Sequence, residues 1–217
     1  MTVHNIHQRI LQQKRLILVE YMGTQIPSFR LKSKDDSILF GILGKLAFWN
    51  PHLNTRFITT LYPHIYVPGG VDDWQHHNPA TAIEILAHEY VHLKDRKKLG
   101  WLFNLLYLSP QIFSLLALMA FLNPWFLLSL LCLLPLSSPG RAWLEFRGYR
   151  MSMAVHYWTR NRCINIDWIV SQFAGSNYYF MLPLRKLLTK AYEREFEKIK
   201  NNDLTSELEE VKSLLRL

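Results

Sequence analysis

The residues best suited to chemistry in this sequence are His88, Glu89 and His92, which form the pattern His-Glu-x-x-His. On a helix, residues four apart project from the same face, so two imidazoles can bind one metal ion. The glutamate lies beside that ion and can take a proton from a metal-bound water without being a ligand. The pattern is expected by chance only roughly 0.02 times in such a chain. It therefore predicts a metal site rather than two solvated histidines.

A catalytic zinc ion takes three protein ligands and keeps a fourth position open for water. The extended pattern with a glycine and a third histidine is excluded, because Asp95 and Lys98 stand at those positions, and no Gly-x-x-Asp pattern follows. Glu145 is the best remaining candidate, since it stands in an apolar helical pattern where an unpaired carboxylate is costly to bury. An ion pair of Glu145 with Arg147 or Arg150 is the alternative.

The helix that carries the two histidines has local signals at both ends. Asn78 is a good N-cap, Pro79 suits the first helical position, and Gly100 indicates the end. Upstream, residues 57–67 are rich in β-branched and aromatic side chains, which predicts a strand with Tyr62-Pro63 at a turn or edge.

Helical periodicity predicts further elements on both sides of this region. They cover residues 4–22, 37–48 (a short helix or a turn), 141–158 and 184–200, and a last helix begins near Asp203 or Ser206. The glutamates at 193–197 and 207–210 stand in charged helical patterns and indicate solvated faces. His76 and His77 are expected in a loop that is solvated or contacts substrate.

From Leu99 to Gly140 the chain has no Asp, Glu, Lys or Arg, and Asn123-Pro124 divides this apolar stretch. As a helix, residues 101–122 would be about 33 Å long, enough to cross a bilayer core, whereas residues 125–138 would reach only about 21 Å. The stretch predicts a membrane hairpin that spans, re-enters or lies at the interface; a hairpin buried in a soluble core is the alternative.

A hairpin also suits the metal site, because the 52 residues between His92 and Glu145 must leave and return to the same place. Basic residues precede the apolar stretch at 94–98 and follow it at 141–150. Positive charge on both flanks places both ends on the cytoplasmic side, with the basic rim near anionic lipid.

Composition excludes several other classes. The net charge is +8, but no Lys/Arg-rich run is interleaved with aromatic residues, so nucleic acid is not an expected partner. Two cysteines cannot build a disulfide framework. The N-terminal segment has no apolar run long enough for a signal peptide.

A helix with HEYVH, an apolar hairpin and a helix with EFRGY together resemble the gluzincin zinc metallopeptidases, and most of all the HtpX and CAAX prenyl protease type. The resemblance covers roughly residues 55–160 and extends to compact minimal gluzincins, some of them phage-encoded. It implies one zinc ion bound by His88, His92 and Glu145, with Glu89 as the base. It also implies that the strand before the motif holds an extended substrate.

The sequence departs from this family pattern at one position. Four residues after the ligand glutamate the family has an aspartate that orients a ligand histidine, and this chain has Tyr149. Tyr149 shares a helix face with Glu145, so its hydroxyl could bond a metal-bound histidine or the oxyanion, or its ring could pack in the core. His156, eleven residues after Glu145 on nearly the same face, is a further candidate for assisting the oxyanion.

The sequence therefore predicts an α+β, mostly helical fold: a gluzincin-like core with a small β-sheet and an apolar helical hairpin inserted between the metal-binding helices. Residues 1–98 and 141–217 are the two parts of a peptidase domain, and residues 99–140 are the hairpin. The expected activity is zinc-dependent hydrolysis of a peptide or protein at a membrane, on its cytoplasmic face. The alternative is a membrane-anchored structural or interaction protein, such as a phage component, with a vestigial or structural metal site.

Overall fold

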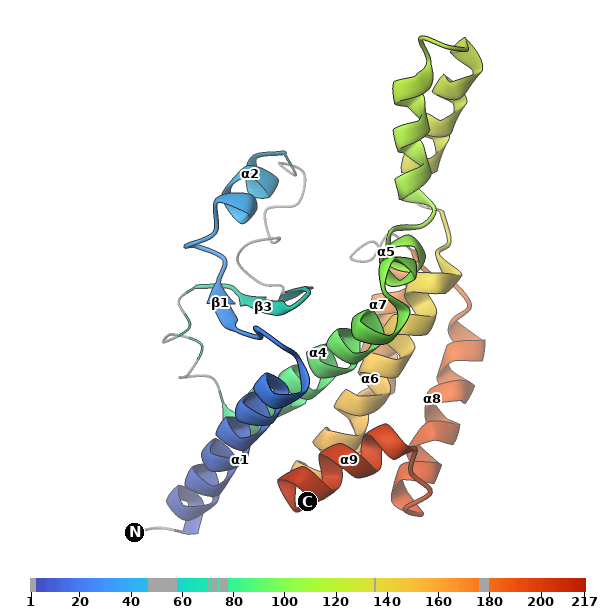
Figure 1. Cartoon of the computed structure of the whole chain (residues 1–217). Helices are drawn as coiled ribbons and strands as arrows, with labels where there is room; N and C mark the ends of the chain where they lie inside the picture. The colour runs from blue at the N-terminus through green and yellow to red at the C-terminus, as the bar shows by residue number, and fades with distance from the viewer. Residues whose placement is uncertain are drawn as a thin grey trace.

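The computed structural model describes residues 3–46, 58–69, 71, 74, 78–134, 136–175 and 180–217. The fold is mostly helical with one small β-sheet, which confirms this part of the prediction. Figure 1 shows long helices in the body, the sheet beside them, and a narrow arm that projects from one end. The predictions for Phe57, His76 and His77 fall outside the described residues.

The centre of the fold is the pair α4 (Pro79–Leu99) and α6 (Pro139–Arg160). The two helices run antiparallel, because Glu84 near the start of α4 meets His156 near the end of α6. About two turns from the other end of each helix, His92 meets Glu145. The region 92–145 thus leaves the body and returns to the same place, as the metal site requires.

The ends of α4 lie where the local signals predict. The Asn78 side chain accepts a hydrogen bond from the backbone N–H of Ala80 at 3.0 Å, and Pro79 follows at the first helical position. Gly100 ends the helix with φ of 58°, a left-handed value that glycine adopts without steric cost. These caps fix which residues of α4 face α6.

Other helices cover this central pair. α1 (Val3–Gln25) packs along α4, and α9 (Ser206–Leu215) contacts α1 and α6. α8 (Arg185–Lys200) contacts α6 and α7 (Ile166–Ala174). α7 was not predicted from the sequence; this short helix begins where the Asn165 side chain accepts a hydrogen bond from the N–H of Trp168.

The sheet contains β1 (Leu31–Ser33), β2 (Thr59–Leu61) and β3 (His64–Val67) in the order β1-β3-β2. β3 pairs parallel with β1 and antiparallel with β2. The predicted strand over 57–67 is therefore a hairpin that turns at Tyr62-Pro63. α2 (Ile38–Leu46) follows β1, and β2 lies at the sheet edge against α4.

The predicted continuous helix over 101–122 is wrong. α5 (Trp101–Leu108) ends before Pro110, and the chain turns by 96° into η1 (Gln111–Met119). Proline cannot donate the helical hydrogen bond, and it disfavours helical geometry in the residue before it. η1 pairs with η2 (Pro124–Leu133), so residues 111–133 form the arm of Figure 1.

Membrane-crossing length is not reached by any single helix among the described residues. α5 and η1 pass a test of length and composition together, but they are separated by the bend at Ser109-Pro110. No residue of η1 or η2 is buried. The prediction of a hairpin buried in a soluble core therefore does not describe this arm.

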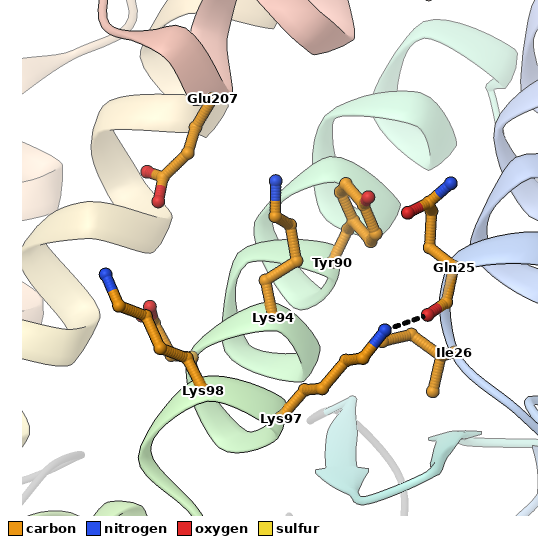
Figure 2. A pocket seen from close by; sticks show the side chains of 8 residues that line it. Gln25, Ile26, Tyr90, Lys94, Lys97, Lys98 and Glu207 are labelled. Atoms are coloured by element: carbon orange, nitrogen blue, oxygen red, sulfur yellow. Dashed lines mark hydrogen bonds between the residues drawn. The ribbon is translucent and has the colours of Figure 1, made fainter.

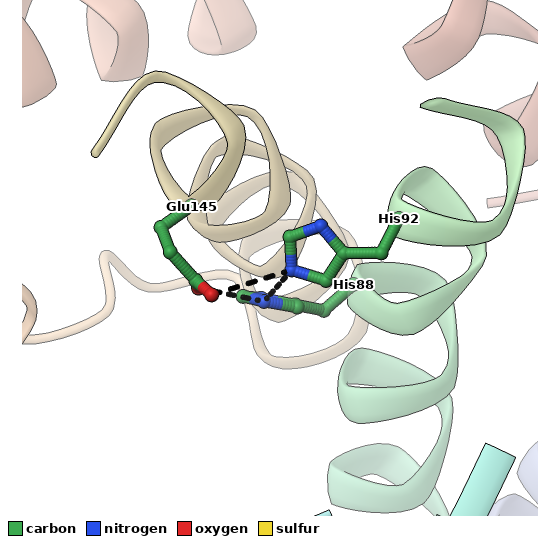
Figure 3. A group of neighbouring side chains, drawn as sticks. All are labelled: His88, His92 and Glu145. Carbon is green, nitrogen blue, oxygen red and sulfur yellow. Dashed lines mark hydrogen bonds and ion pairs between the residues drawn. The ribbon is translucent and has the colours of Figure 1, made fainter. Parts of the chain in front are cut away.

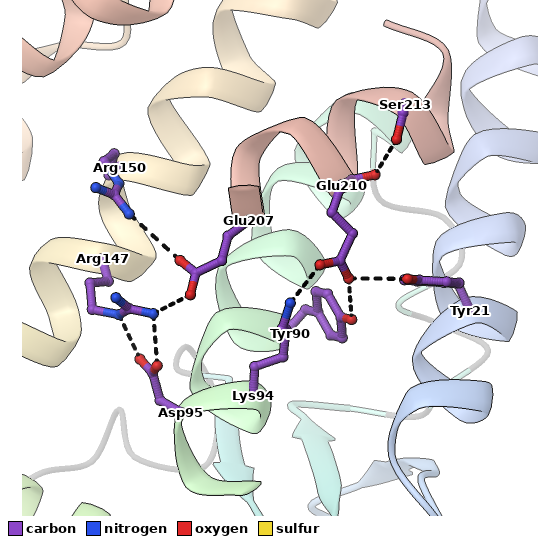
Figure 4. A network of polar contacts seen from close by, with 9 residues as sticks. All are labelled: Tyr21, Tyr90, Lys94, Asp95, Arg147, Arg150, Glu207, Glu210 and Ser213. Atoms are coloured by element: carbon purple, nitrogen blue, oxygen red, sulfur yellow. Dashed lines mark hydrogen bonds and ion pairs between the residues drawn. The ribbon is translucent and has the colours of Figure 1, made fainter. Parts of the chain in front are cut away.

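A polar network ties α9 to the centre of the fold (Figure 4). Glu210 accepts hydrogen bonds from Tyr21, Tyr90 and Lys94, and these donors come from α1 and α4. Glu207 pairs with arginines of α6. The glutamates at 193–197 and 207–210 were predicted to lie on solvated faces. That prediction is wrong for Glu195, Glu207 and Glu210, whose side chains are ion-paired and 14%, 26% and 27% exposed, because the amphipathic pattern does not show which polar groups pair between helices.

Candidate metal centre

His88 and His92 project from the face of α4 that packs against α6, and the Glu145 carboxylate approaches them from α6 (Figure 3). The exposed fractions of the three residues are 9%, 5% and 2%, so the group is buried. The two Nε2 atoms are 3.1 Å apart. Glu145 Oε2 lies 3.4 Å from His88 Nε2, and Oε1 lies 3.7 Å from His92 Nε2.

These three ligand atoms form a group that can hold a metal ion, since all lie within 4.8 Å of one another. Among the described residues, Glu145 Oε2 has no hydrogen-bond partner, and a buried carboxylate oxygen without one is costly. One divalent cation would satisfy this oxygen and both Nε2 atoms together. Imidazole and carboxylate ligands suit zinc and other divalent transition metals.

The alternative role for Glu145, an ion pair with an arginine, is not what the structure has. Arg147 forms a bidentate ion pair with Asp95 and also binds Glu207. Arg150 also faces Glu207. Both arginines therefore neutralise other carboxylates, and Glu145 faces the histidines.

Without a metal ion, electrostatic attraction holds the three side chains of the site together. Burial lowers the pKa of His92, but the Glu145 carboxylate outweighs it and raises that pKa to about 9. Burial raises the pKa of Glu145, but the facing imidazoles of His92 and His88 hold it well below its usual range. The site thus favours a negatively charged Glu145 next to a positive charge. When no metal is present, that positive charge is a protonated His92.

Two hydroxyl groups orient the ligands from outside. Ser152 Oγ lies 3.2 Å from His88 Nδ1, which leaves Nε2 directed at the other ligands. Tyr107, from α5, donates to Glu145 Oε1 at 2.7 Å. Its ring stacks on Phe103 at 5.7 Å between centroids. Tyr107 was not predicted as a site residue; the signal for it was a tyrosine in an apolar stretch, where a buried hydroxyl needs a partner.

Gly148 is a second residue of the site that was not predicted from the sequence. A Cβ built at this position would lie 2.6 Å from His88 Nε2, 2.7 Å from Cε1 and 2.9 Å from Cδ2. Real Cβ contacts are longer than this, so only glycine allows α6 to approach the imidazole so closely. The glycine of EFRGY therefore makes room for the His88 ring.

Glu89 lies beside the metal face of α4 and points toward the sheet. Thr60, on the edge strand β2, donates a hydrogen bond to Glu89 Oε2 at 2.6 Å. The bond orients the carboxylate, and the positive charge of the buried Lys34 also acts on it. Glu89 is thus placed between the candidate ligands and the strand that was expected to hold substrate.

The Tyr149 ring packs against its neighbours, as one of its predicted roles requires. Its ring meets His88 edge-to-face, with centroids 4.8 Å apart, and it also packs against Trp168 and Phe173. The ring supports the side of the imidazole. His92 Nδ1 has no hydrogen-bond partner among the described residues.

His156 is not brought to the metal ligands. It lies about 16 Å along α6 from Glu145, because eleven residues separate them. Its Nδ1 is 2.9 Å from Glu84 Oε2, and Arg160 binds the same carboxylate oxygen at 2.7 Å. The helical period carries His156 to the correct face but to the far end of the helix pair, where it belongs to an ion-paired cluster.

A cavity of about 370 Å³ lies beside α4 (Figure 2). Lys94, Asp95 and Lys97 of α4 line it, and none of His88, His92 and Glu145 is part of the lining. Lys97 donates to the backbone oxygen of Gln25, and Lys94 binds a carboxylate of α9. This cavity is therefore separate from the metal ligands.

Comparisons with models of protein families, with curated proteins and with solved structures find no match to this chain. What the centre can do chemically follows from its own residues. Those are two imidazoles and a carboxylate around one point, with a glutamate on the adjacent helix position.

Proposed function

We propose that this protein is a zinc-dependent endopeptidase with a gluzincin-like core that hydrolyses peptide bonds at a membrane surface. The observation that carries the proposal is the buried group of His88, His92 and Glu145, with ligand atoms within 4.8 Å of one another and Glu89 next to it. Three protein ligands leave one position for water, as in catalytic zinc sites.

A structural metal site would be closed by a fourth protein ligand. Among the described residues the group contains three ligands. This favours a catalytic centre over the second candidate, a membrane-anchored structural or interaction protein with a structural ion.

A zinc ion at this point would lower the pKa of its bound water to about 7 and polarise the scissile carbonyl. Glu89 would accept the proton released from that water and return it to the leaving amine. Thr60 donates a hydrogen bond to Glu89 Oε2 and so holds the carboxylate beside the candidate ligands. Tyr107 donates to Glu145 Oε1, so Glu145 would offer Oε2 to the ion.

The edge strand β2 supports a peptide as the substrate. It pairs with β3 on one side and is the last strand of the sheet on the other. An extended peptide can add to such an edge by main-chain hydrogen bonds. Thr60 of β2 contacts Glu89, so a peptide along this strand passes close to the base.

The arm supports the membrane location. Residues 99–140 contain no charged side chain, and both ends of the arm return to the same end of the body (Figure 1). Basic residues stand on both sides of this stretch, which supports a body on the cytoplasmic face.

The experiment that tests the peptidase role compares wild type with Glu89→Gln and with Glu193→Gln, an exposed glutamate of α8. We expect one zinc ion per chain in all three proteins. Cleavage of an unfolded protein substrate should be lost in Glu89→Gln, by at least 100-fold as for loss of a general base, and retained in Glu193→Gln. Full activity of Glu89→Gln would remove Glu89 from the reaction.

A further inference from the structure

The surface of the arm is apolar on all sides. Neither η1 nor η2 has a buried residue. Large exposed side chains follow one another directly, as in the pairs Leu115 and Leu116, Leu127 and Leu128, and Leu130 and Leu131. Consecutive residues point in different directions around a helix, so the exposed apolar surface surrounds the arm.

Such a surface identifies lipid as the occupant rather than a protein groove. A helix that docks on a protein has one apolar face and one polar face, whereas a helix that is apolar all round is buried or in a membrane. The arm projects away from the body (Figure 1), so the body does not bury it. The stretch 99–140 contains no charge that would oppose entry into hydrocarbon.

The length of the arm fits one leaflet. η1 has 9 residues and η2 has 10. At about 2.0 Å per residue in 3₁₀ geometry they are about 18 and 20 Å long. The hydrocarbon core of a bilayer is about 30 Å thick. Half of that thickness is about 15 Å, so the tip, at 120–123, lies near the middle of the bilayer.

α5 forms the base of the arm and runs in a different direction from the arm itself. It is bent by 96° from η1, so when η1 stands along the membrane normal, α5 lies parallel to the membrane. Trp101, with 73% of its surface exposed, Leu102 and Leu108 face outward from α5. Phe103 and Tyr107 face inward to His92 and Glu145.

Anchoring residues of the types found at membrane interfaces surround this base. Trp101 begins α5 and the exposed Trp143 lies in the first turns of α6. Arg141 donates to the backbone oxygen of Tyr107 at 2.7 Å and so fixes α5 to α6. Tryptophan and basic side chains favour the headgroup layer, and basic ones favour anionic lipid.

We propose that the arm enters a single leaflet of an anionic phospholipid bilayer while α5 lies flat in the headgroup layer. This inference rests on the membrane location in the proposed function. The metal ligands then lie directly beneath α5, about 10 Å, one helix diameter, from the lipid. α5 is an interfacial helix whose outer face contacts lipid and whose inner face contacts the metal centre.

Depth measurements on the full chain in vesicles test this geometry. A fluorescent label is attached to Phe121→Cys at the tip or to Leu102→Cys on α5, in a background with Cys132→Ser and Cys163→Ser. The vesicles contain phosphatidylcholine and phosphatidylglycerol. We expect the tip label to be quenched most by lipids brominated near the bilayer centre and to be protected from dithionite on either side. The Leu102→Cys label should be quenched by headgroup-labelled lipid.

Two outcomes would overturn the proposal. If the tip label is quenched only by dithionite inside the vesicle, the arm crosses the bilayer. A tip label that external dithionite quenches at once would mean that the arm is outside it.

A pair of charge variants gives a second measurement. Leu128→Glu on the arm should weaken vesicle association by about 100-fold, as expected for a carboxylate in hydrocarbon. Leu187→Glu, at a similarly exposed leucine of α8, should leave it unchanged. Equal effects of the two variants would contradict insertion of the arm. None of these readouts uses metal or catalysis, so an inactive protein with a deep tip would reject the peptidase and keep this geometry.

Discussion

Replacement of Gly148 by alanine tests the close approach of α6 to the metal ligands. The added Cβ would lie 2.6 Å from His88 Nε2, the atom directed at Glu145 and His92. Non-bonded heavy atoms prefer about 3.5 Å or more. The imidazole must therefore move by about 1 Å, or α6 must shift away from α4.

Two opposing effects set the change in folding stability. Alanine is more favourable than glycine inside a helix by about 1 kcal/mol. Overpacking in a well-packed interior costs about 1–3 kcal/mol. The metal-free Gly148→Ala protein should therefore lose between about 0 and 2 kcal/mol of unfolding free energy and remain folded. Metal binding should suffer more, because Nε2 must stay about 2.0–2.1 Å from a zinc ion. We expect a loss of 10- to 100-fold in zinc affinity, about the loss seen when ligand orientation is disturbed.

The assay is a competition titration of zinc against a chromophoric chelator, with chemical unfolding of the metal-free protein alongside. Gly23→Ala is the matched control, because this glycine also lies in a helix and a Cβ there has nothing within 4 Å. It should gain about 0.5–1 kcal/mol in stability with unchanged zinc affinity. A folded Gly148→Ala protein that binds zinc like wild type would refute the geometry.

Two further predictions concern the ligand environment. Tyr107→Phe keeps the ring but removes the hydrogen bond to Glu145, so zinc affinity measured by chelator competition should fall by about 10-fold; Tyr21→Phe, which removes a similar bond to Glu210, should leave it unchanged. Without metal, His92 has a pKa raised from 6.5 to about 9 in the folded protein, so its contribution to stability is complete below pH 6.5 and is lost as pH rises toward 9. Thermal unfolding in a chelator should therefore show a falling Tm from pH 6.5 to 9. With zinc, Tm should instead rise from pH 5 to 7 as the ligands lose protons, and equal trends with and without zinc would contradict the assignment.

Local signals were sufficient for the helix that carries the histidines. Asn78, Pro79 and Gly100 affect only the backbone within a few residues of their own positions, and α4 begins and ends where they predict. The position of Glu145 could also be anticipated, because an isolated carboxylate in an apolar pattern needs a cation or a metal. These inferences depend on chemistry rather than on knowledge of the fold.

Features that depend on packing could not be predicted in the same way. Gly148 and Tyr107 act through contacts with residues of another helix, and no periodicity in the sequence marks those contacts. His156 was predicted to lie near Glu145 because both share a helix face. The distance along the helix axis separates them, and His156 contacts Glu84 instead. The bend at Pro110 is different, because proline is a local signal that outweighs the apolar length of the segment.

The measurement that tests the metal centre most directly is X-ray absorption at the zinc edge, together with metal content, on wild type and Glu145→Gln. The structure predicts one ion per chain in wild type, bound by two imidazoles and by oxygen donors at about 2.0–2.2 Å. Glu145→Gln should lose most of the ion or one oxygen donor. A wild-type protein without bound metal, or a spectrum that Glu145→Gln leaves unchanged, would contradict the assignment of His88, His92 and Glu145 as ligands.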